Sequence, residues 1–411
     1  MINAIQQEIN NLNNKYILLT GHHKINLSEK DFSNKRLHSF NGVIKVNRPD
    51  LVIDGADATI EITLKNLTTN WSLFRIDQEA CDVELRNLRV KVIIENPSDC
   101  DNHFAGIYNT AFGLKINNSQ IELYSNKQIN LYGVYNNGNL DTHMDTKADN
   151  LVIDNSTFKV NVFSESFVHY IVSCGIFNNL ANSISVQNSF IYAVNKGNGD
   201  LQKAIGIYTN GRFGRFIGNN IKANGLHPEG LKLEECHVYG FINDGLFSII
   251  SNNNIVGEWA GVATALLNRG EYSIISGNKL LSTHTIYGKT IKTCSEKAFI
   301  ENNIIISTSK NARLVVLRSS NTVISHNYME VLLPLDDCIS GCGVYAILKN
   351  IDKNIITENI FKNIKDCGMF VNYNIGFIGN NQFSLDDALE ISNHDNFIIS
   401  EKLNKQNIKS I

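Results

Sequence analysis

The feature that most constrains this chain is a repeated phrase: a short apolar run, an asparagine, and a second apolar run. It occurs as LVIDNSTF at Asn155, as RFIGNNIK at Asn219 and as IISGNKLL at Asn278. The same slot is filled by Gly55, Asn87, Asn118, Asn188, Asn253, Asn302, Asn327, Asn359 and Asn380. Neighbouring slots lie 21 to 37 residues apart. Repetition with a period of about 20–50 residues indicates a solenoid.

Each repeat predicts three strands. The apolar residues alternate with polar ones and are rich in Ile, Val, Phe and Leu, which is typical of strands. Asn and Gly tolerate a left-handed backbone, so the slot predicts a sharp corner between two strands. A second phrase begins with or contains Gly and occurs at 105–109, 132–136, 174–178, 205–209, 230–234, 260–264, 342–346 and 367–371.

Three strands per turn, with each turn stacked in parallel on the next, predict an all-β chain folded as a parallel β-helix of about 12 turns. An antiparallel sandwich is the alternative. It needs hairpin turns about every 8–12 residues, and Asn-Gly turns between strands are few in this sequence. The β-helix is therefore the better interpretation.

The ends of the chain fit a capped solenoid. Residues 2–13 (INAIQQEINNLN) read as an amphipathic helix, and we assign residues 1–14 as an N-terminal cap over the otherwise open sheet edges. The repeat runs almost from end to end and no Pro- or Ser-rich linker interrupts it, so we expect one domain over 1–400. Residues 401–411 are polar and are assigned to a C-terminal tail or cap.

The opening of the chain resembles a known superfamily. The cap helix is followed by KYILLTGHHKINL and PDLVIDGADATIEI, and this order is similar to the start of the pectate-lyase-like right-handed β-helices. Polygalacturonases, alginate-modifying enzymes and phage tailspikes belong to that superfamily, whose two-residue turn carries an Asn ladder. The resemblance covers roughly residues 1–390. It implies a right-handed fold and a substrate groove along the Gly-containing strands, but no single activity.

The charge and hydropathy of the chain exclude two classes of partner, nucleic acid and the membrane interior. The net charge of −3 and the 19% of charged residues give no basic surface for nucleic acid. No run of about 18 apolar residues predicts a membrane span, and the first residues show no signal peptide. The location stays open between cytoplasmic, virion-associated, and secreted with the signal removed. The oligomeric state stays open between monomer and homotrimer.

No cofactor is predicted from the residues. The eight cysteines show no paired CxxC motifs of the kind that bind zinc, and no Asp-rich set of Ca²⁺ ligands stands out. Only the resemblance would allow a Ca²⁺ ion. Several cysteines stand directly before the strand Gly, which indicates small buried side chains in one stack.

The Gly-containing strands predict a sugar-binding face. If the residue after each Gly points into the core, the next one faces solvent. This outward row holds Tyr108, Tyr135, Phe177, Tyr208, Lys232, Ala263, Tyr345 and Phe370. The outward slot two residues further is mostly polar and holds Thr110, Asn137, Asn179, Asn210, Glu234 and Ala265. Exposed aromatic faces suit sugar rings and flanking amides suit hydroxyls, although the same stack would also serve only to stabilise the sheet.

One segment concentrates the ionisable residues. In LHPEGLKLEECHVYGFIND, residues 226–244, the candidates for catalysis are His227, Glu229, Lys232, Glu234, His237 and Asp244. The candidates for substrate binding are Tyr108, Tyr135, Phe177, Tyr208, Asn210, Arg212 and Arg215. Lys232 and Glu234 are the preferred reacting pair, because the outward row becomes charged there.

Three functions remain open for this segment. A lyase or epimerase needs a base such as Lys232 or His227, with Arg212 and Arg215 neutralising a uronate carboxylate. A glycoside hydrolase needs two carboxylates, for example Glu234 with Glu229 or Asp244. A tailspike-like or adhesin-like rod would bind glycan without cleaving it. We predict a carbohydrate-active enzyme on an acidic polysaccharide, with the binding protein as the alternative.

Overall fold

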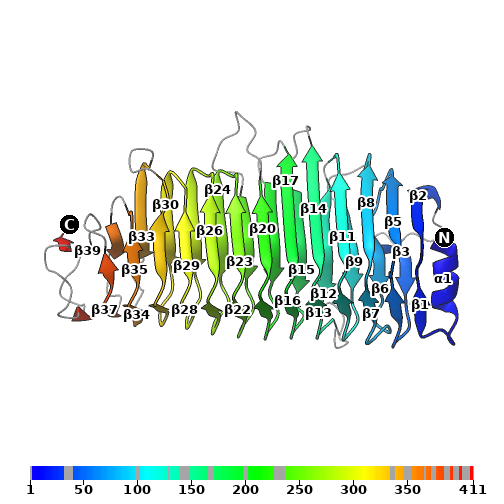
Figure 1. The fold of residues 1–411 in the computed structure, drawn as a ribbon, viewed down its shortest axis with the longest axis horizontal. Helices are drawn as coiled ribbons and strands as arrows, with labels where there is room; N and C mark the ends of the chain where they lie inside the picture. The colour runs from blue at the N-terminus through cyan, green and yellow to red at the C-terminus, as the bar shows by residue number, and fades with distance from the viewer. Residues whose placement is uncertain are drawn as a thin grey trace. The chain divides into compact units, whose positions relative to one another are not determined.

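The computed structural model describes residues 2–31, 40–97, 102–127, 129–138, 148–164, 171–197, 202–225, 237–333, 338–346, 353–364, 367–371, 376–383, 389–391, 398–399 and 408–410. Within these residues the strands fall into three parallel sheets, here called A, B and C, and every third strand along the chain returns to the same sheet (Figure 1). This is a right-handed parallel β-helix with an N-terminal helix, as the sequence predicts.

The chain divides into two compact units, which we describe separately. The first comprises Met1–Arg215 and Asn224–Leu231, and the second Phe216–Ala223 and Lys232–Ile411. The first unit opens with α1 (Ile2–Asn10) and also contains the short 3₁₀ helix η1 (Glu29–Asp31).

The strands of the first unit are as follows. Sheet A holds β1 (Tyr16–Leu18), β4 (Val52–Asp54), β7 (Glu84–Arg86), β10 (Lys115–Asn117), β13 (Val152–Asp154) and β16 (Ser185–Gln187). Sheet B holds β2 (His22–Ser28), β5 (Thr59–Lys65), β8 (Arg89–Glu95), β11 (Gln120–Ser125), β14 (Thr157–Ser164) and β17 (Phe190–Gly197). Sheet C holds β3 (Asn41–Val46), β6 (Trp71–Ile76), β9 (His103–Asn109), β12 (Asn130–Asn137), β15 (Ile171–Asn179) and β18 (Gln202–Thr209).

The later strands follow the same order, with successive strands, except the last, belonging to sheets A, B and C in turn. Sheet A holds β19 (Arg215–Ile217), β22 (Ile249–Ser251), β25 (Ile274–Ser276), β28 (Phe299–Glu301), β31 (Val323–Ser325), β34 (Asn354–Thr357), β37 (Gly376–Gly379) and β40 (Ile398–Ile399). Sheet B holds β20 (Asn220–Asn224), β23 (Asn254–Glu258), β26 (Lys279–Thr283), β29 (Ile304–Ser307), β32 (Tyr328–Val331), β35 (Ile360–Lys362) and β38 (Gln382–Phe383). Sheet C holds β21 (His237–Asn243), β24 (Val262–Asn268), β27 (Tyr287–Thr293), β30 (Asn311–Leu317), β33 (Ser340–Ala346), β36 (Cys367–Val371), β39 (Leu389–Ile391) and β41 (Ile408–Ser410).

The corner between sheets A and B is the repeated phrase of the sequence. The predicted left-handed backbone is confirmed at Asn87, Asn118, Asn155, Asn188, Asn302 and Asn380, whose φ angles are 45° to 56°. It is wrong at Gly55, where Ala56 is left-handed instead. It is also wrong at Asn219, Asn253, Asn278, Asn327 and Asn359, because the residue before each of them adopts the positive φ: Gly218, Asn252, Gly277, His326 and Glu358.

These five asparagines, together with Asn303 and Asn381, form a ladder in the second unit that is buried except at its last member, Asn381. Each side-chain Nδ2 donates to the Oδ1 of the next asparagine at 2.9–3.0 Å, from Asn219 to Asn381. Each Oδ1 also accepts the backbone N–H of the preceding ladder residue at 2.9–3.0 Å. The inward amide at this corner therefore satisfies main-chain groups that burial would otherwise leave unpaired.

The Gly of the second phrase permits close packing between turns. A Cβ atom at Gly133 would stand 2.4 Å from the carbonyl oxygen of Gly175 on the next turn. The following residues point inward as predicted: Ile107, Val134, Ile176 and Ile207 are in register and fully buried. The outward row then begins with the next residue of each strand.

The predicted register was wrong in β24 of the second unit. Phe241 of β21 fills the interior position in register with Leu266 of β24, and both are fully buried. The prediction had placed Val262 there, and the predicted interior residue Leu231 lies outside the described residues. Ala263 is likewise buried and pairs with Val238, so Leu267 takes the outward position that was predicted for Ala263. Gly261 was a poor marker because the bend of β24 contains Ala265 instead of a glycine, whereas β21 carries Gly240 directly before Phe241.

Helix α1 lies against the first strands, and its predicted capping role is supported by its contacts. Ile5 and Ile9 are buried, and the Gln6 side chain pairs with the Lys45 backbone in β3. Gln6 Nε2 donates to the Lys45 carbonyl at 3.0 Å, and Gln6 Oε1 accepts the Lys45 N–H at 2.9 Å. A side-chain amide thus takes the place of a neighbouring strand at this edge of sheet C.

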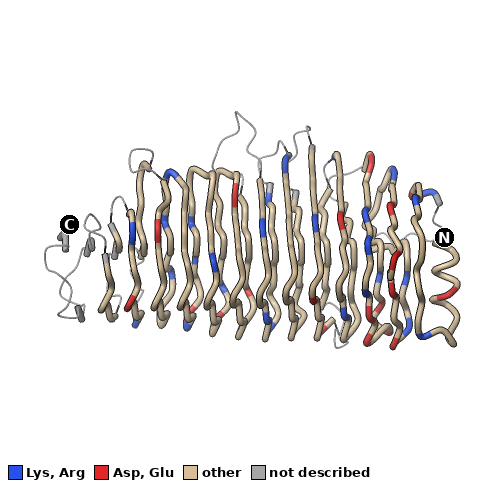
Figure 2. Tube along the Cα trace, viewed as in Figure 1, with Lys and Arg blue, Asp and Glu red and all other residues tan. Residues whose placement is uncertain are grey.

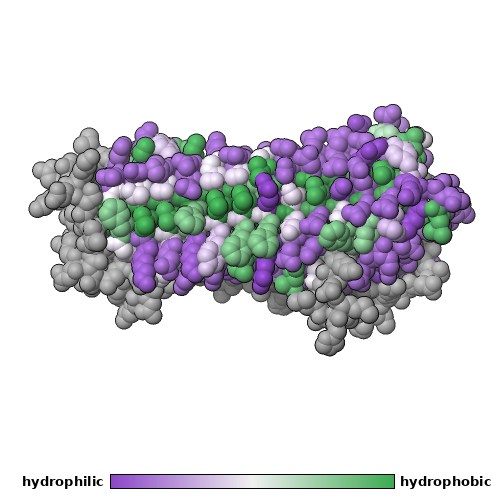
Figure 3. Space-filling model, turned by 90° about the horizontal axis from the view of Figure 1, so that it is seen from below, coloured by the Kyte–Doolittle hydropathy of each residue, from purple (hydrophilic) through white to green (hydrophobic). Residues whose placement is uncertain are grey.

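The outer face of sheet A in the second unit is apolar. Its outward positions are in register and hold Ile249, Ile274, Phe299, Val323, Ile355 and Phe377. Ile274, Phe299 and Ile355 are 37–42% exposed. Figure 3 shows a hydrophobic row between hydrophilic margins on the side seen from below. Polar groups are absent from this row, so it lacks the hydrogen-bonding partners that a sugar site requires.

Candidate functional site

The predicted aromatic row exists on the outer face of sheet C in the first unit. Tyr108, Tyr135, Phe177 and Tyr208 are in register on β9, β12, β15 and β18. Their ring centroids are 5.7, 4.9 and 4.7 Å apart along the row, and the last pair is stacked at 13°. We call these four residues the aromatic platform.

The first ring of the aromatic platform is covered by the chain itself. The Phe40 ring stacks on Tyr108 with a centroid separation of 4.4 Å and an interplanar angle of 18°. Tyr108 is consequently only 9% exposed. Tyr135, Phe177 and Tyr208 are half-buried, so the accessible part of the platform starts at Tyr135.

An amide row runs beside these rings, as predicted. Asn137 donates to the Tyr108 hydroxyl at 3.1 Å, Asn179 donates to Asn137 Oδ1 at 3.0 Å, and Asn210 donates to Asn179 Oδ1 at 3.4 Å. Asn210 Oδ1 also accepts the backbone N–H of Leu180. An amide nitrogen carries two hydrogens and an amide oxygen two lone pairs. The row can therefore hold its shape and still bond a hydroxyl-rich ligand.

Tyr135 of the platform acts as a neutral group. Burial, followed by the neighbouring Tyr108, Tyr208 and Cys174, raises the pKa of Tyr135 to about 12. At neutral pH its hydroxyl remains protonated, so it serves as a hydrogen-bond donor and acceptor and not as a base.

Two residues that the sequence reasoning did not select extend this surface. Tyr132 packs edge-on against Tyr135 at 5.0 Å and Phe177 at 5.4 Å. His103 stacks on Tyr132 at 5.8 Å, and its Nδ1 lies 3.2 Å from the Tyr132 hydroxyl. The bend at Gly133 turns Tyr132 to the same side as Tyr135, which simple alternation along the strand does not predict.

The two predicted arginines lie beyond the end of β18. Arg212 is exposed in the connection to β19, where its backbone N–H donates to Asn182 Oδ1 at 2.9 Å. Arg215 is the first residue of β19 and thus belongs to sheet A, whereas the aromatic platform lies on sheet C. Only Arg212 extends directly from a platform strand.

Four of the six catalytic candidates, His227, Glu229, Lys232 and Glu234, lie outside the described residues. His237 is described as the first residue of β21, half-buried, with its ring parallel to Tyr239 at 6.1 Å. Asp244 follows the same strand and forms a two-point ion pair, with Arg269 Nε and Nη2 each 2.6 Å from one carboxylate oxygen. A general-acid role for Asp244 would require this pair to open.

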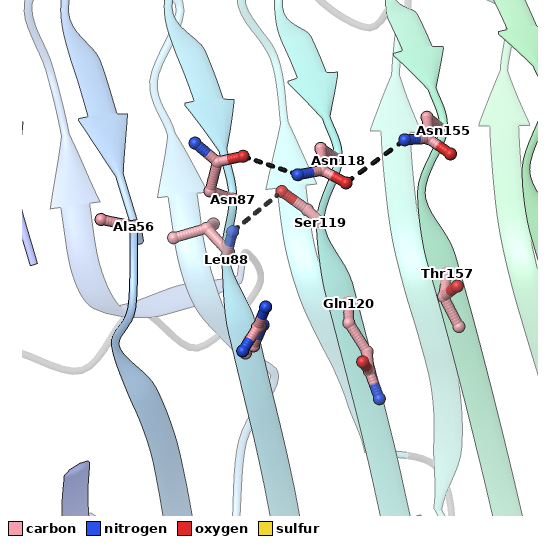
Figure 4. Close-up of a pocket in the computed structure, with 9 residues that line it drawn as sticks. Ala56, Asn87, Leu88, Asn118, Ser119, Gln120, Asn155 and Thr157 are labelled. Carbon is pink, nitrogen blue, oxygen red and sulfur yellow. Dashed lines mark hydrogen bonds between the residues drawn. The ribbon is translucent and has the colours of Figure 1, made fainter. Parts of the chain in front are cut away.

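A polar recess lies at the A–B corner of the first unit (Figure 4). It has a volume of about 300 Å³ and is lined in part by the corner amides of Asn87, Asn118 and Asn155. Asn118 donates to Asn87 at 2.7 Å, and Asn155 donates to Asn118 at 3.2 Å. The recess has no aromatic surface, which makes it a weaker sugar site than the platform.

The described part of the chain shows neither a metal-binding group of side chains nor a membrane-spanning helix. No group of three or more His, Cys, Asp and Glu side chains is arranged there to hold a metal ion. No described helix is long and apolar enough to cross a membrane.

Comparison with known proteins gives structural relatives alone. No protein-family model and no curated protein matches the sequence. The A-module of Azotobacter vinelandii mannuronan C-5 epimerase AlgE6 aligns over 97% of this chain and 95% of its own, with a TM-score of 0.57 at 12% identity. The AlgE4 A-module aligns over 97% and 94%, with a TM-score of 0.59 at 11% identity.

The tailspike protein of E. coli bacteriophage HK620, solved in complex with a pentasaccharide, aligns over 97% of this chain and 70% of its own. Its TM-score is 0.52 at 10% identity. At such identities the likeness shows the fold alone. The chain has the right-handed parallel β-helix fold that the epimerase modules and the tailspike share.

Proposed function

We propose that this chain is a carbohydrate-active protein that binds a polysaccharide on the aromatic platform and modifies it. The observation that carries the proposal is the register of Tyr135, Phe177 and Tyr208, which presents successive half-buried rings on one face. Rings on adjacent strands repeat at about 4.8 Å, close to the length of one sugar residue.

The amide row supports a carbohydrate in preference to a plain apolar ligand. Asn137 and Asn179 end β12 and β15, and Asn210 directly follows β18, so the three amides stand beside the rings of the same strands. A sugar ring offers an apolar face to an aromatic side chain and hydroxyls around its rim. The structural relatives include polysaccharide-modifying modules and a tailspike that binds a pentasaccharide, which agrees with this ligand class.

Binding is tested by titrating a panel of neutral and uronate oligosaccharides into the full chain and into Tyr135→Ala and Tyr208→Ala. Loss of one stacking ring is expected to weaken binding by about tenfold, which corresponds to about 1.4 kcal/mol. Tyr192→Ala is the matched control, because Tyr192 is half-buried on β17 of sheet B, away from the platform. Equal affinities in all variants would refute the platform.

Catalysis by lyase or hydrolase chemistry is the finer part of the proposal. Lys232 and Glu234 remain the proposed reacting pair, with His227 and Glu229 beside them in the sequence and His237 at the start of β21. A lyase would use Lys232 as base at a uronate, and a hydrolase would use Glu234 as one of two carboxylates.

Turnover is tested by incubating the same polysaccharides with the wild type, Lys232→Ala and Glu234→Ala. New unsaturated uronate, detected by ultraviolet absorbance, would identify a lyase, and new reducing ends without it would identify a hydrolase. Each substitution is expected to abolish turnover while oligosaccharide affinity persists. If no polysaccharide is changed but binding requires Tyr208, the chain is a glycan-binding protein, the alternative function.

A further inference from the structure

Basic side chains gather on the outer face of sheet C in the second unit. Lys289 of β27 is in register with Arg313 of β30, and Lys292 lies three residues further along β27. Arg318 directly follows β30, and its backbone N–H donates to the Thr293 carbonyl at 2.9 Å. We call Lys289, Lys292, Arg313 and Arg318 the basic cluster. Figure 2 shows basic positions on successive turns of this unit.

The cluster is close enough for its charges to interact. Burial, followed by the charges of Lys292, Arg313 and Arg318, lowers the pKa of Lys289, although Cys294 acts in the opposite direction. Arg313 is fixed in place, because its guanidinium lies 3.9 Å from the centroid of the Tyr345 ring. Lys289, Lys292 and Arg313 are half-buried and Arg318 is exposed.

No carboxylate neutralises these four cations within the described residues. Ion pairs are present elsewhere in the second unit, for example between Arg269 and Asp244 at 2.6 Å, but none involves a member of the basic cluster. Half-buried like charges without a counter-charge are unfavourable. An anionic ligand would remove this repulsion and gain charge-assisted hydrogen bonds from the guanidinium groups.

We propose that the basic cluster is a binding site for the acidic groups of an anionic glycan, either carboxylates or sulfates. The inference rests on the proposed function in so far as the ligand is a carbohydrate, but it concerns different residues on different strands. A planar guanidinium stacked on Tyr345 is suited to two-point binding of a carboxylate or sulfate. The chain's net charge of −3 argues against a nucleic acid, whose backbone requires a more extended basic surface.

The test uses the full chain and two matched pairs of probes. Polygalacturonate is compared with its methyl ester, and dextran sulfate with dextran, so that each pair differs in charge while the sugar backbone is retained. Affinity is measured at low and at elevated NaCl for the wild type, the double variant Lys292→Gln/Arg313→Gln and the exposed-site variant Arg318→Gln. The matched control is Lys279→Gln, because Lys279 is an exposed cation on β26 of sheet B.

The wild type should bind at least one charged probe more tightly than its neutral partner, and salt should weaken this binding because it screens charge. The double variant should bind that probe at least tenfold more weakly, with smaller salt dependence, and Arg318→Gln should show a smaller loss. Preference for polygalacturonate or for dextran sulfate then assigns the acidic group. Removal of Arg313 also removes its contact with Tyr345 and can disturb the local structure. In that case the Arg318→Gln variant, in which this contact is retained, still tests the site.

Three results would overturn the inference: unchanged affinity in both variants, an equal loss in Lys279→Gln, or equally tight binding of a DNA oligonucleotide. Its failure can be told apart from failure of the proposed function. If Tyr135→Ala and Tyr208→Ala lose binding but the cluster variants do not, the platform stands and this site fails. The reverse result retains this site and rejects the platform.

Discussion

The buried asparagine ladder makes a quantitative prediction at Asn303. Its Nδ2 donates to the Ile275 carbonyl at 2.8 Å, and its Oδ1 accepts the backbone N–H of Asn278 at 2.9 Å. Asn303 is 1% exposed, so water cannot replace these bonds without rearrangement. Replacing it with alanine leaves one N–H and one carbonyl without this side-chain partner. At about 1–3 kcal/mol for each buried group, Asn303→Ala should destabilise the second unit by about 4 kcal/mol.

The neighbouring Asn302 is the matched control. It is exposed and has a φ of 56°, so its alanine variant loses only the tolerance of asparagine for a left-handed backbone. That loss is about 1 kcal/mol. Urea unfolding, followed by circular dichroism, gives the free energy of unfolding of each variant. The two values can be compared directly if that free energy falls with urea concentration at the same slope in both variants. Hydrogen exchange at the Asn278 amide gives a local measurement, which is useful because solenoids can unfold in parts.

A double-mutant cycle tests whether the ladder acts through direct bonds. Asn278 Nδ2 donates to Asn303 Oδ1 at 3.0 Å, so Asn278→Ala and Asn303→Ala share this bond. The double variant should be less destabilised than the sum of the single variants, by about 0.5–1.5 kcal/mol. If Asn303→Ala costs no more than Asn302→Ala, or if its Asn278 amide stays protected, the reasoning about the ladder is refuted.

Three further predictions follow from other contacts. Burial opposes ionisation of Asp54, but hydrogen bonds from Tyr16, Asn87, the Ala56 amide and Arg86 hold the pKa of its carboxyl well below its usual value. Its stabilisation is therefore complete above the unfolded pKa of about 3.9 and is lost as pH falls below it. Asp54→Asn should flatten the acid side of the stability profile, and an unchanged slope would contradict this. Gln6→Ala should speed hydrogen exchange at the Lys45 amide, while Gln7→Ala, the adjacent exposed helix residue, should not. Lys289→Met should raise the thermal midpoint of the second unit because it removes like-charge repulsion, and should weaken binding of the charged probes; a lowered midpoint would show that the lysine stabilises the fold.

The fold could be predicted because the repeat uses residue types, such as glycine and asparagine, that suit only a few backbone positions. A glycine such as Gly133 is required where two turns approach closely, and the aromatic residue two positions later then faces outward. In β24 the same bend contains Ala265, so the sequence offered no marker and the predicted register failed. The A–B corner was ambiguous for another reason. Asparagine suits both the left-handed position and the buried position after it, as Asn302 and Asn303 show.

The candidate site was only partly accessible to sequence reasoning. The aromatic platform follows from alternation along β9, β12, β15 and β18, and its four rings were all predicted. Coverage of Tyr108 by Phe40 depends on a contact between residues far apart in the chain, which no local pattern encodes. Lys289 and Arg313 become neighbours only through the register of β27 with β30.

The asparagine ladder also limits the positions at which residues can be inserted or deleted. Gly277 and Asn278 are the whole connection between β25 and β26, and Asn302 and Asn303 the whole connection between β28 and β29. An inserted residue there would move every later amide off its partner. The connections from sheet B to sheet C differ in length along the chain, from the three residues 284–286 to the twelve residues 225–236. Variation in chain length should therefore accumulate in these connections beside sheet C, while the ladder keeps the turns aligned.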